Sequence, residues 1–371
     1  MKYISIFVLL SVTHLAQAEV ITSALTPATI SCAIFNKQTV KVQSNLTLPK
    51  NCILQDTRFV FENVQNVSLN LNGATLQSSK LVDAIRFSTT NPAKPTRNVT
   101  IKNGTIKGYG TALVVHRLLT NAELQNLRAN PVGFYPIIQR TATQQVTIDN
   151  INFDHPYGTA VFVYVGNGSI TLKNSRITGA RGPAIYLDTG SNNNRIINNT
   201  ITKSGFLDPD GGVKFGRSQR EAIAVDGSYN NSISNNVLAD NARGGVHLYS
   251  NCGEKYHTDP DYVPRIFDAQ KNIITNNTIQ NNGLGGAVEV GKRVDWNLES
   301  WDCAKPVYAR FFTFKYYWDN SGYNTIKSNR GNGVINIRTD NNTIIDNMQR
   351  VDIGSSVRDL KGDPLRNNVL Q

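Results

Sequence analysis

The sequence predicts an all-β solenoid in which a single chain winds through successive coils of short strands. Three observations favour this fold. A short apolar phrase recurs along most of the chain, and an Asn-rich phrase precedes most copies of it. In both phrases apolar residues alternate with residues of variable type. Alternation with period two is typical of a strand that buries one face. Copies of the apolar phrase open at residues 160 and 184, which is 24 apart, and at 222 and 245, which is 23 apart. A unit of that length without a helical period is one coil of a single-stranded parallel β-helix.

The first 18 residues have the features of a secretory signal peptide. Lys2 precedes an apolar run from Ile4 to Leu10, and Ala16-Gln17-Ala18 provides a small-x-small cleavage site. The run is too short to span a bilayer, and no later segment has the apolar length of a membrane helix. We therefore expect a secreted or periplasmic protein with no membrane span.

The remaining chain divides into three parts. Residues 19–65 are the least regular, and we expect them to form an N-terminal cap and the first turns, because an open solenoid end would expose unpaired strand edges. Residues 66–350 carry the repeats and are predicted to form the β-helix. Residues 351–371 are expected to form a C-terminal turn and tail.

All four cysteines lie beyond the expected cleavage site, at Cys32, Cys52, Cys252 and Cys303. Their spacing matches no zinc motif, and in an oxidising compartment two disulfides are the favoured interpretation, with buried free thiols as the alternative. Three connectivities are possible. Proximity in the sequence favours Cys32–Cys52 and Cys252–Cys303.

The Asn-rich phrase places an asparagine between two apolar residues in each repeat. Asparagine tolerates a left-handed backbone and suits a corner between two strands, where stacked copies would form a ladder of amides. The predicted column is Asn103, Asn150, Asn174, Asn199, Asn236, Asn277 and Asn347.

The apolar phrase predicts which side chains face away from the core. Its second and fourth positions are apolar and face inward, so its third and fifth positions face outward. The third-position column is Arg86, Val114, Phe162, Tyr186, Ala224, His247, Glu289 and Asn336. The fifth-position column is Ser88, His116, Tyr164, Asp188, Asp226, Tyr249, Gly291 and Arg338.

The outward columns bring titratable residues together between residues 186 and 293. Neighbouring coils lie about 4.8 Å apart, so these side chains should share one patch. The candidate catalytic residues are His247, Tyr249, Asp226, Glu289 and Arg220. The candidate substrate-binding residues are Tyr186, Asp188, Glu221, Glu254, Arg265, Lys292, Arg293 and Trp296. Because Asp188 and Asp226 on adjacent coils would repel, one of them has a raised pKa or the pair binds a cation, for which Ca²⁺ is the candidate.

Four long insertions interrupt the repeat next to the outward columns. They run over residues 117–145, 205–219, 252–271 and 291–323. Insertions on one side of a solenoid usually build its binding face, so we expect these long loops to surround the patch on one face.

The repeats from about Asn66 to Asn347 resemble those of right-handed parallel β-helix proteins, the pectate-lyase-like, carbohydrate-active proteins of the exported bacterial type. The segment from Gly244 to Glu254, followed by Arg265 and Trp301-Asp302-Cys303, is similar to a motif of such proteins. That resemblance implies that Glu254, Arg265, Cys252 and Cys303 form a supported loop beside the patch. The run Asp154-His155-Pro156-Tyr157 weakly resembles a signature of mannuronan epimerases, and we interpret it as a corner.

Charge and site together suggest an enzyme acting on an acidic polysaccharide. The net charge of +11 suits an anionic partner, and no nucleic-acid-binding motif accompanies it. A lyase would use His247 as base, Tyr249 as acid and an arginine, Arg220, Arg265 or Arg293, to hold the uronate carboxylate. The alternatives are a C5-epimerase, an inverting hydrolase that uses Asp226 and Glu289, and a non-catalytic binding or surface protein. We expect a monomer.

Overall fold

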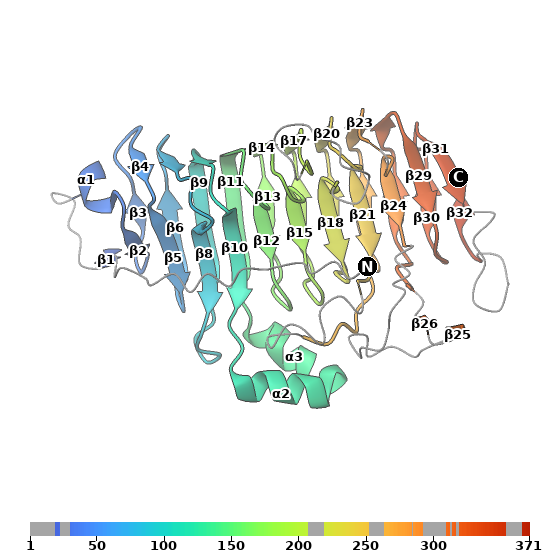
Figure 1. The fold of residues 1–371 in the computed structure, drawn as a ribbon, viewed down its shortest axis with the longest axis horizontal. Coiled ribbons are helices and arrows are strands. Elements are labelled where there is room, and N and C mark those ends of the chain that lie inside the picture. The colour runs from blue at the N-terminus through green and yellow to red at the C-terminus, as the bar shows by residue number, and fades with distance from the viewer. Residues whose placement is uncertain are drawn as a thin grey trace, which may run out of the picture.

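The computed structural model describes residues 19–22, 30–206, 219–251, 263–283, 285–291, 309–311, 314–316, 319–353 and 366–371. These residues confirm the parallel β-helix. Successive strands lie side by side along the longest dimension of the molecule, in the order of the sequence (Figure 1).

One face of the solenoid is a 12-stranded parallel sheet, called sheet A below. Each strand pairs with the strand of the next coil rather than with its neighbour in sequence, as a solenoid requires. Its strands are β1 (Glu19–Ile21), β2 (Thr39–Lys41), β5 (Arg58–Glu62), β8 (Asp83–Thr89), β10 (Thr111–Arg117), β12 (Val161–Val163), β15 (Ile185–Leu187), β18 (Ile223–Asp226), β21 (Val246–Tyr249), β24 (Val288–Val290), β29 (Val334–Ile337) and β31 (Arg350–Ile353).

Two further stacks of strands complete each coil. The first contains β3 (Leu46–Thr47), β6 (Gln65–Asn70), β13 (Thr171–Lys173), β16 (Arg195–Ile197), β19 (Ser232–Ser234), β22 (Ile273–Thr275), β27 (Thr325–Lys327), β30 (Thr343–Ile345) and β32 (Val369–Leu370). The second contains β4 (Ile53–Gln55), β7 (Thr75–Gln77), β14 (Arg176–Thr178), β17 (Thr200–Thr202), β20 (Val237–Ala239), β23 (Thr278–Gln280) and β28 (Arg330–Gly331). Strands β9 (Arg97–Lys107) and β11 (Gln144–Asp154) belong to both stacks, and they turn the corner at Asn103 and Asn150, whose φ angles are 63° and 55°.

The predicted asparagine column is in fact two columns. Asn103, Asn150 and Asn174 have a left-handed backbone, as expected of a corner. In the later coils this conformation belongs to the preceding residue, such as Asn235, while Asn236 turns inward and is buried. The prediction combined the corner asparagines and the inward asparagines in one column, because either member of an Asn-Asn pair can be aligned with the single asparagine of the earlier repeats.

The inward asparagines form the expected ladder of amides. The side chains of Asn199, Asn236, Asn277, Asn329 and Asn347 are linked in that order, each donating to the carbonyl oxygen of the next at 2.9–3.0 Å. Each of these oxygens also accepts the backbone N–H of the preceding member. The ladder therefore satisfies polar groups inside the coil that water does not reach.

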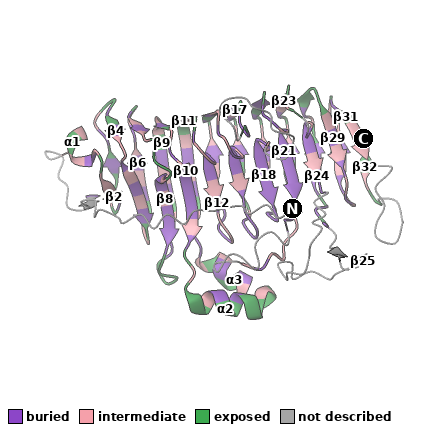
Figure 2. Ribbon diagram, in the orientation of Figure 1, coloured by how far each residue is buried: buried purple, intermediate pink, exposed green. Residues whose placement is uncertain are grey.

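The register of sheet A confirms the predicted outward columns. Tyr186 pairs with Ala224, Ala224 with His247, and His247 with Glu289, while Asp226 pairs with Tyr249. The alternate positions, such as Ile223 and Val246, lie in the core. The outward residues of β18 and β21 are nevertheless buried, so both strands are coloured as buried along their length (Figure 2).

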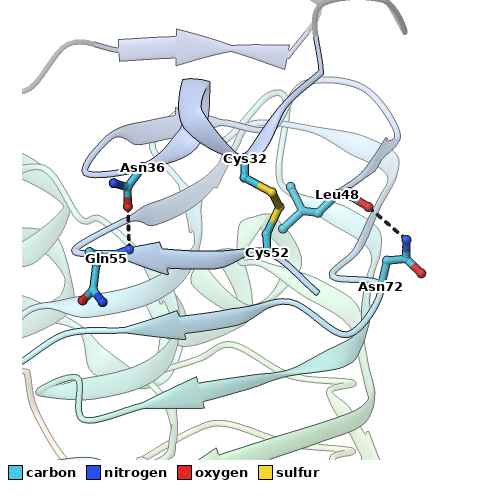
Figure 3. Close-up of a disulfide and its surroundings, with 6 residues drawn as sticks. All are labelled: Cys32, Asn36, Leu48, Cys52, Gln55 and Asn72. Atoms are coloured by element: carbon cyan, nitrogen blue, oxygen red, sulfur yellow. Dashed lines mark hydrogen bonds between the residues drawn. A yellow bond between two sulfur atoms is a disulfide. The ribbon is translucent and has the colours of Figure 1, made fainter. Parts of the chain in front are cut away.

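The disulfide between Cys32 and Cys52 confirms the expected pairing at the N-terminal end (Figure 3). It joins the short helix α1 (Cys32–Phe35) to the residue before β4, across a sequence separation of 20 residues. Closing a loop of that length stabilises a fold by about 3 kcal/mol, mainly by restricting the unfolded chain. Cys252 and Cys303, and the expected signal peptide at 1–18, lie outside the described residues.

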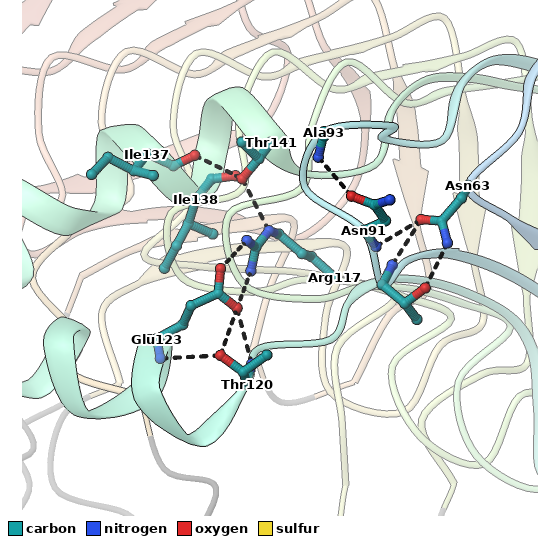
Figure 4. Close-up of polar contacts among 10 residues, drawn as sticks. Asn63, Asn91, Ala93, Arg117, Thr120, Glu123, Ile137, Ile138 and Thr141 are labelled. Atoms are coloured by element: carbon teal, nitrogen blue, oxygen red, sulfur yellow. Dashed lines mark hydrogen bonds and ion pairs between the residues drawn. The ribbon is translucent and has the colours of Figure 1, made fainter.

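The insertion at 117–145 forms two helices that the sequence analysis did not predict. Helix α2 (Asn121–Ala129) begins with a capping box between Thr120 and Glu123, and α3 (Pro131–Thr141) begins with Asn130 as cap and proline in the first turn. Both are recognised start signals of helices. Arg117, at the end of β10, pairs with Glu123 at 2.5 Å and donates to Thr141 at 3.0 Å, which fixes both helices to sheet A (Figure 4).

Strands β25 (Ala309–Phe311) and β26 (Phe314–Tyr316) form an antiparallel pair outside the coils. No helix within the described ranges has the length and apolar character needed to cross a membrane.

The ladder predicts a contrast between two adjacent asparagines. Replacing Asn236 by Ala leaves the backbone and side-chain amides of Asn199 and the carbonyl of Ile196 without this partner, which should cost about 1–3 kcal/mol or more and lower the melting temperature. Replacing Asn235 by Gly keeps the left-handed backbone of an exposed corner and should change the melting temperature little. Thermal unfolding followed by circular dichroism compares the two variants. Equal losses in both would show that the ladder does not stabilise the coil.

Candidate functional site

The candidate site lies on the outward side of β18, β21 and β24, where the repeat places one residue of each coil above the next. His247 stands between Ala224 and Glu289 in this register. Ala224 has no side chain beyond its methyl group, so the imidazole ring has room on that side. The same alternation that buries Val246 and Leu248 therefore directs His247 and Tyr249 to the outer face together.

His247 is the central residue of the site and is 4% exposed. Its Nδ1 atom lies 4.0 Å from a carboxylate oxygen of Glu221, and its Nε2 atom lies 3.7 Å from a carboxylate oxygen of Glu289. Nε2 is buried and has no hydrogen-bond partner among the described residues. A buried polar atom without a partner is rare outside functional sites, so this nitrogen is the strongest candidate for contact with a ligand.

Two glycines make room for the imidazole ring. A methyl group added at Gly285 would stand 2.5 Å from Nε2 of His247, and one at Gly244 would stand 2.6 Å from the same atom. Any larger residue at either position would displace the ring. The backbone of two successive coils is thus shaped around His247.

Glu221 connects His247 to Tyr249. One of its carboxylate oxygens accepts a hydrogen bond of 2.9 Å from the Tyr249 hydroxyl, while the other faces His247. Burial by itself would raise the pKa of Glu221, but the charge of His247 and the hydrogen bonds from Tyr249 and from the backbone outweigh it and lower the pKa. Glu221 therefore remains an anion that orients both side chains.

A small cavity of about 60 Å³ opens between these groups. The described residues that line it are Arg220, Glu221, Arg243, His247, Tyr249, Glu289 and Gly291. Gly291 occupies the position of Tyr249 in the next coil, and its φ of 78° is one that residues with a side chain rarely adopt.

Arg243 is a cavity residue that the sequence analysis missed. It lies three residues before Val246, as Arg220 lies three residues before Ile223, and these two residues pair between adjacent coils. Extending the repeat alignment by three positions would have found it. Neither arginine has an ion-pair partner in the part of the chain that the structure describes, so the cavity has two cationic groups available to an anion.

A second group of predicted residues forms a separate, closed cluster. Arg265 pairs with Asp188 at 2.9 Å and with Asp226 at 3.0 Å, and Asp226 also accepts hydrogen bonds from the Tyr186 hydroxyl and from the backbone N–H of Asn251 at 2.7 Å. Asp226 has no exposed surface. Its pKa is raised because burial and the nearby Asp188 outweigh the stabilising effect of Arg265.

This cluster changes the expected roles of three residues. Arg265 lies between the carboxylates of Asp188 and Asp226, where the sequence analysis considered calcium. Because its guanidinium is paired with both, it is not available to bind a substrate carboxylate. Asp226 does not line the cavity and has its carboxylate fully engaged. Within the described ranges, no group of three or more His, Cys, Asp or Glu side chains is arranged to hold a metal ion.

Helix α3 helps to place Arg265. Tyr135 in this helix donates a hydrogen bond of 2.6 Å to the carbonyl of Pro264, and its ring meets that of Phe267 edge to face. Gln139 ties the same helix to the turn after β15 through the carbonyl of Gly190 at 2.7 Å. The helical insertion thus presses the segment that carries Arg265 onto sheet A.

Four predicted substrate-binding residues lie outside the described residues: Glu254, Lys292, Arg293 and Trp296. The remaining catalytic and substrate-binding candidates divide into two groups. The cavity contains His247, Tyr249, Glu289, Arg220 and Glu221. The separate cluster contains Tyr186, Asp188, Asp226 and Arg265.

Comparison with solved structures identifies proteins of similar fold. An alginate lyase from Paenibacillus sp. str. FPU-7 is 12% identical, with a TM-score of 0.51, over 89% of this chain and 93% of that chain. The A-module of the Azotobacter vinelandii mannuronan C-5 epimerase AlgE6 is 13% identical, with a TM-score of 0.46, over 91% of this chain and 84% of that chain. The Streptococcus pneumoniae surface protein and adhesin PfbA is 14% identical, with a TM-score of 0.43, over 90% of this chain and 72% of that chain. At these identities the likeness concerns the fold.

A comparison with curated protein sequences found no match. The family model of the right-handed β-helix region matches residues 43–201 and 93–294, which together span more than half of the chain. Repeats, coil register and family model agree, and the chain belongs to the right-handed β-helix family.

Proposed function

We propose that this protein is an exported lyase that cleaves a uronate-containing polysaccharide by β-elimination. The observation that carries the proposal is the cavity in which His247 and Tyr249, from a single strand, face two arginines that have no ion-pair partner among the described residues. A base, an acid and cationic groups for a carboxylate are the three components that β-elimination from a uronate needs.

The reaction assigns one step to each group. Arg220 and Arg243 bind the carboxylate of the uronate and stabilise the negative charge that develops on it. Nε2 of His247 takes the proton from the carbon next to that carboxylate. The bond from the neighbouring carbon to the glycosidic oxygen then breaks, a carbon–carbon double bond forms, and the Tyr249 hydroxyl gives its proton to the departing oxygen.

Glu221 is a positioning residue in this scheme. Its anionic carboxylate holds the Tyr249 hydroxyl and faces Nδ1 of His247, which favours the imidazole orientation with Nε2 toward the cavity. After the reaction Nε2 of His247 carries the proton and lies 3.7 Å from a carboxylate oxygen of Glu289, whose side chain is 20% exposed and offers a route to water. His247 releases its proton by this route, and Tyr249 takes one back from water.

Export and substrate class have separate support. The Cys32–Cys52 disulfide suits an oxidising compartment, as does the signal sequence expected at 1–18. The likeness in fold to an alginate lyase makes uronate polymers the first substrates to assay.

The first prediction concerns His247. Wild-type protein incubated with alginate, polygalacturonate and glycosaminoglycans should release unsaturated uronate from at least one polymer, measured by its ultraviolet absorbance. His247→Ala should lower kcat on that polymer by about 10²–10⁴-fold without changing the melting temperature, because it removes the base.

Three outcomes would contradict the lyase. New reducing ends without unsaturated product would indicate hydrolysis. Uronates whose configuration at C5 is inverted, detected by NMR without cleavage of the polymer, would indicate epimerisation. Polymer binding that His247→Ala leaves intact, with no product of any kind, would indicate a binding protein.

The second prediction concerns the two arginines. Arg220→Gln and Arg243→Gln should each reduce kcat/KM on the uronate polymer by about 10–100-fold, because a charged hydrogen bond to the carboxylate is lost. Arg195→Gln removes the same charge from an exposed position in β16 and should leave kcat/KM unchanged. Equal effects of all three substitutions would show that overall charge, not the cavity, binds the polymer.

A further inference from the structure

A groove of about 780 Å³ runs along the corner where the second stack of strands turns toward sheet A. Its floor consists of residues that directly follow strand ends in successive coils, namely Gly108, His155, Gly179, Lys203 and Asp240. All five have positive φ angles, so the corner repeats in every coil. These five coils, spaced about 4.8 Å apart, span about 19 Å, and the lining continues to Gln55 and Gln77 of two earlier coils.

The run Asp154-His155-Pro156-Tyr157 lies in this groove and is the corner that the sequence analysis expected. Strand β11 ends at Asp154, and His155 has a φ of 49°. The imidazole of His155 lies over Gly179 of the next coil, where a methyl group would stand 2.3 Å from the ring. The proposed reaction does not use this motif.

The groove is rich in cations. Lys107, Arg181 and Lys203 line it, and Asp240 contributes the one carboxylate among the lining residues that the structure describes. Lys107 is paired with Asp154 at 2.9 Å, but Arg181 and Lys203 have no ion-pair partner among the residues that the structure describes. Two unneutralised cations about one coil apart suit a ligand whose negative charges recur along a chain.

The groove also offers aromatic surface. The guanidinium of Arg181 stacks over the ring of Tyr157, 4.5 Å from its centroid, which holds the cation in place. Phe206, in the coil next to that of Arg181, also lines the groove and is 39% exposed. Exposed rings beside cations are suited to sugars that carry carboxylates, because the ring packs on the apolar face of the sugar while the cations pair with its charge.

The groove leads to the cavity of the candidate site. Gly205 precedes Phe206, and its carbonyl accepts a hydrogen bond of 2.9 Å from the backbone N–H of Arg220, while its own N–H donates to Ala180 at 2.7 Å. A residue with a side chain at Gly205, whose φ is 87°, would collide with the Arg220 backbone. Gly205 and Arg220 thus pair at the base of the insertion within one coil, which places Phe206 of the groove close to Arg220 of the cavity.

We infer that this groove is a second binding subsite, which holds the part of the acidic polysaccharide that extends beyond the cavity, through Arg181, Lys203 and Phe206. The inference rests on the proposed function for the class of ligand. It adds that chain length determines affinity, because only a long oligosaccharide reaches from the cavity into the groove.

The test measures binding in the His247→Ala background, so that turnover does not interfere. The probes are short and long oligomers of mannuronate and of galacturonate, with maltooligosaccharides as neutral controls, studied by isothermal titration calorimetry. Adding Arg181→Gln and Lys203→Gln should weaken binding of the long uronate oligomers by about five- to tenfold and leave short oligomers unaffected. The matched control, Lys102→Gln with Arg195→Gln, removes two exposed charges on other strands and should have no effect.

Several results would overturn the inference. These are equal weakening by the control pair, equal weakening for short and long oligomers, unchanged binding of long oligomers, or no binding of uronate oligomers at all. Tighter binding of a DNA oligonucleotide than of the long uronates would assign the groove to another polyanion and would also overturn it. The proposed function fails separately, when wild-type protein forms no unsaturated product, whatever the binding experiment gives.

Discussion

The vertical alignment of side chains in successive coils is the constraint on which this structure depends. A residue sits about 4.8 Å above its counterpart in the next coil, so each position meets the same kind of residue repeatedly. Isoleucines and valines satisfy this in the core, and asparagines satisfy it at the inward corners, where each amide bonds to the next. A side chain that breaks its column must find other partners. In the candidate site His247, Tyr249 and Glu289 are such side chains, and they lie against one another and Glu221.

His247 illustrates how the column shapes the site. Its counterparts in the flanking coils are Ala224 and Glu289, and the glycines at 244 and 285 remove the side chains that would otherwise collide with the imidazole. The room around the imidazole thus comes from two glycines and from Ala224 in the coils around it, so the alignment that stabilises the fold also shapes the site.

The sequence was sufficient where the repeat determines position. The eight copies of the apolar phrase all coincide with strands of sheet A, and the outward placement of His247, Tyr249 and Glu289 follows from their number in the phrase. Arg243 was within reach of the same reasoning. The sequence named Arg265 as a candidate but could not predict its position. Arg265 lies in an insertion that is placed by contacts with α3, and no periodic pattern relates residue 265 to residue 135. The two helices, by contrast, were predictable from the sequence, because Thr120 with Glu123 and Asn130 with Pro131 are recognisable start signals.

The buried cluster of Asp188, Asp226 and Arg265 fastens an insertion to the solenoid. A charged group buried without a partner costs several kcal/mol, so two carboxylates on adjacent coils would destabilise the fold unless a cation lay between them. Arg265 meets this need at 2.9 and 3.0 Å. The same contacts fasten the segment 263–267 over the end of sheet A, one coil from Tyr249, to which Asp226 is paired in the register. The electrostatic requirement of two acids in neighbouring coils thus holds a non-repeating segment against the repeat, next to the coil that carries Tyr249.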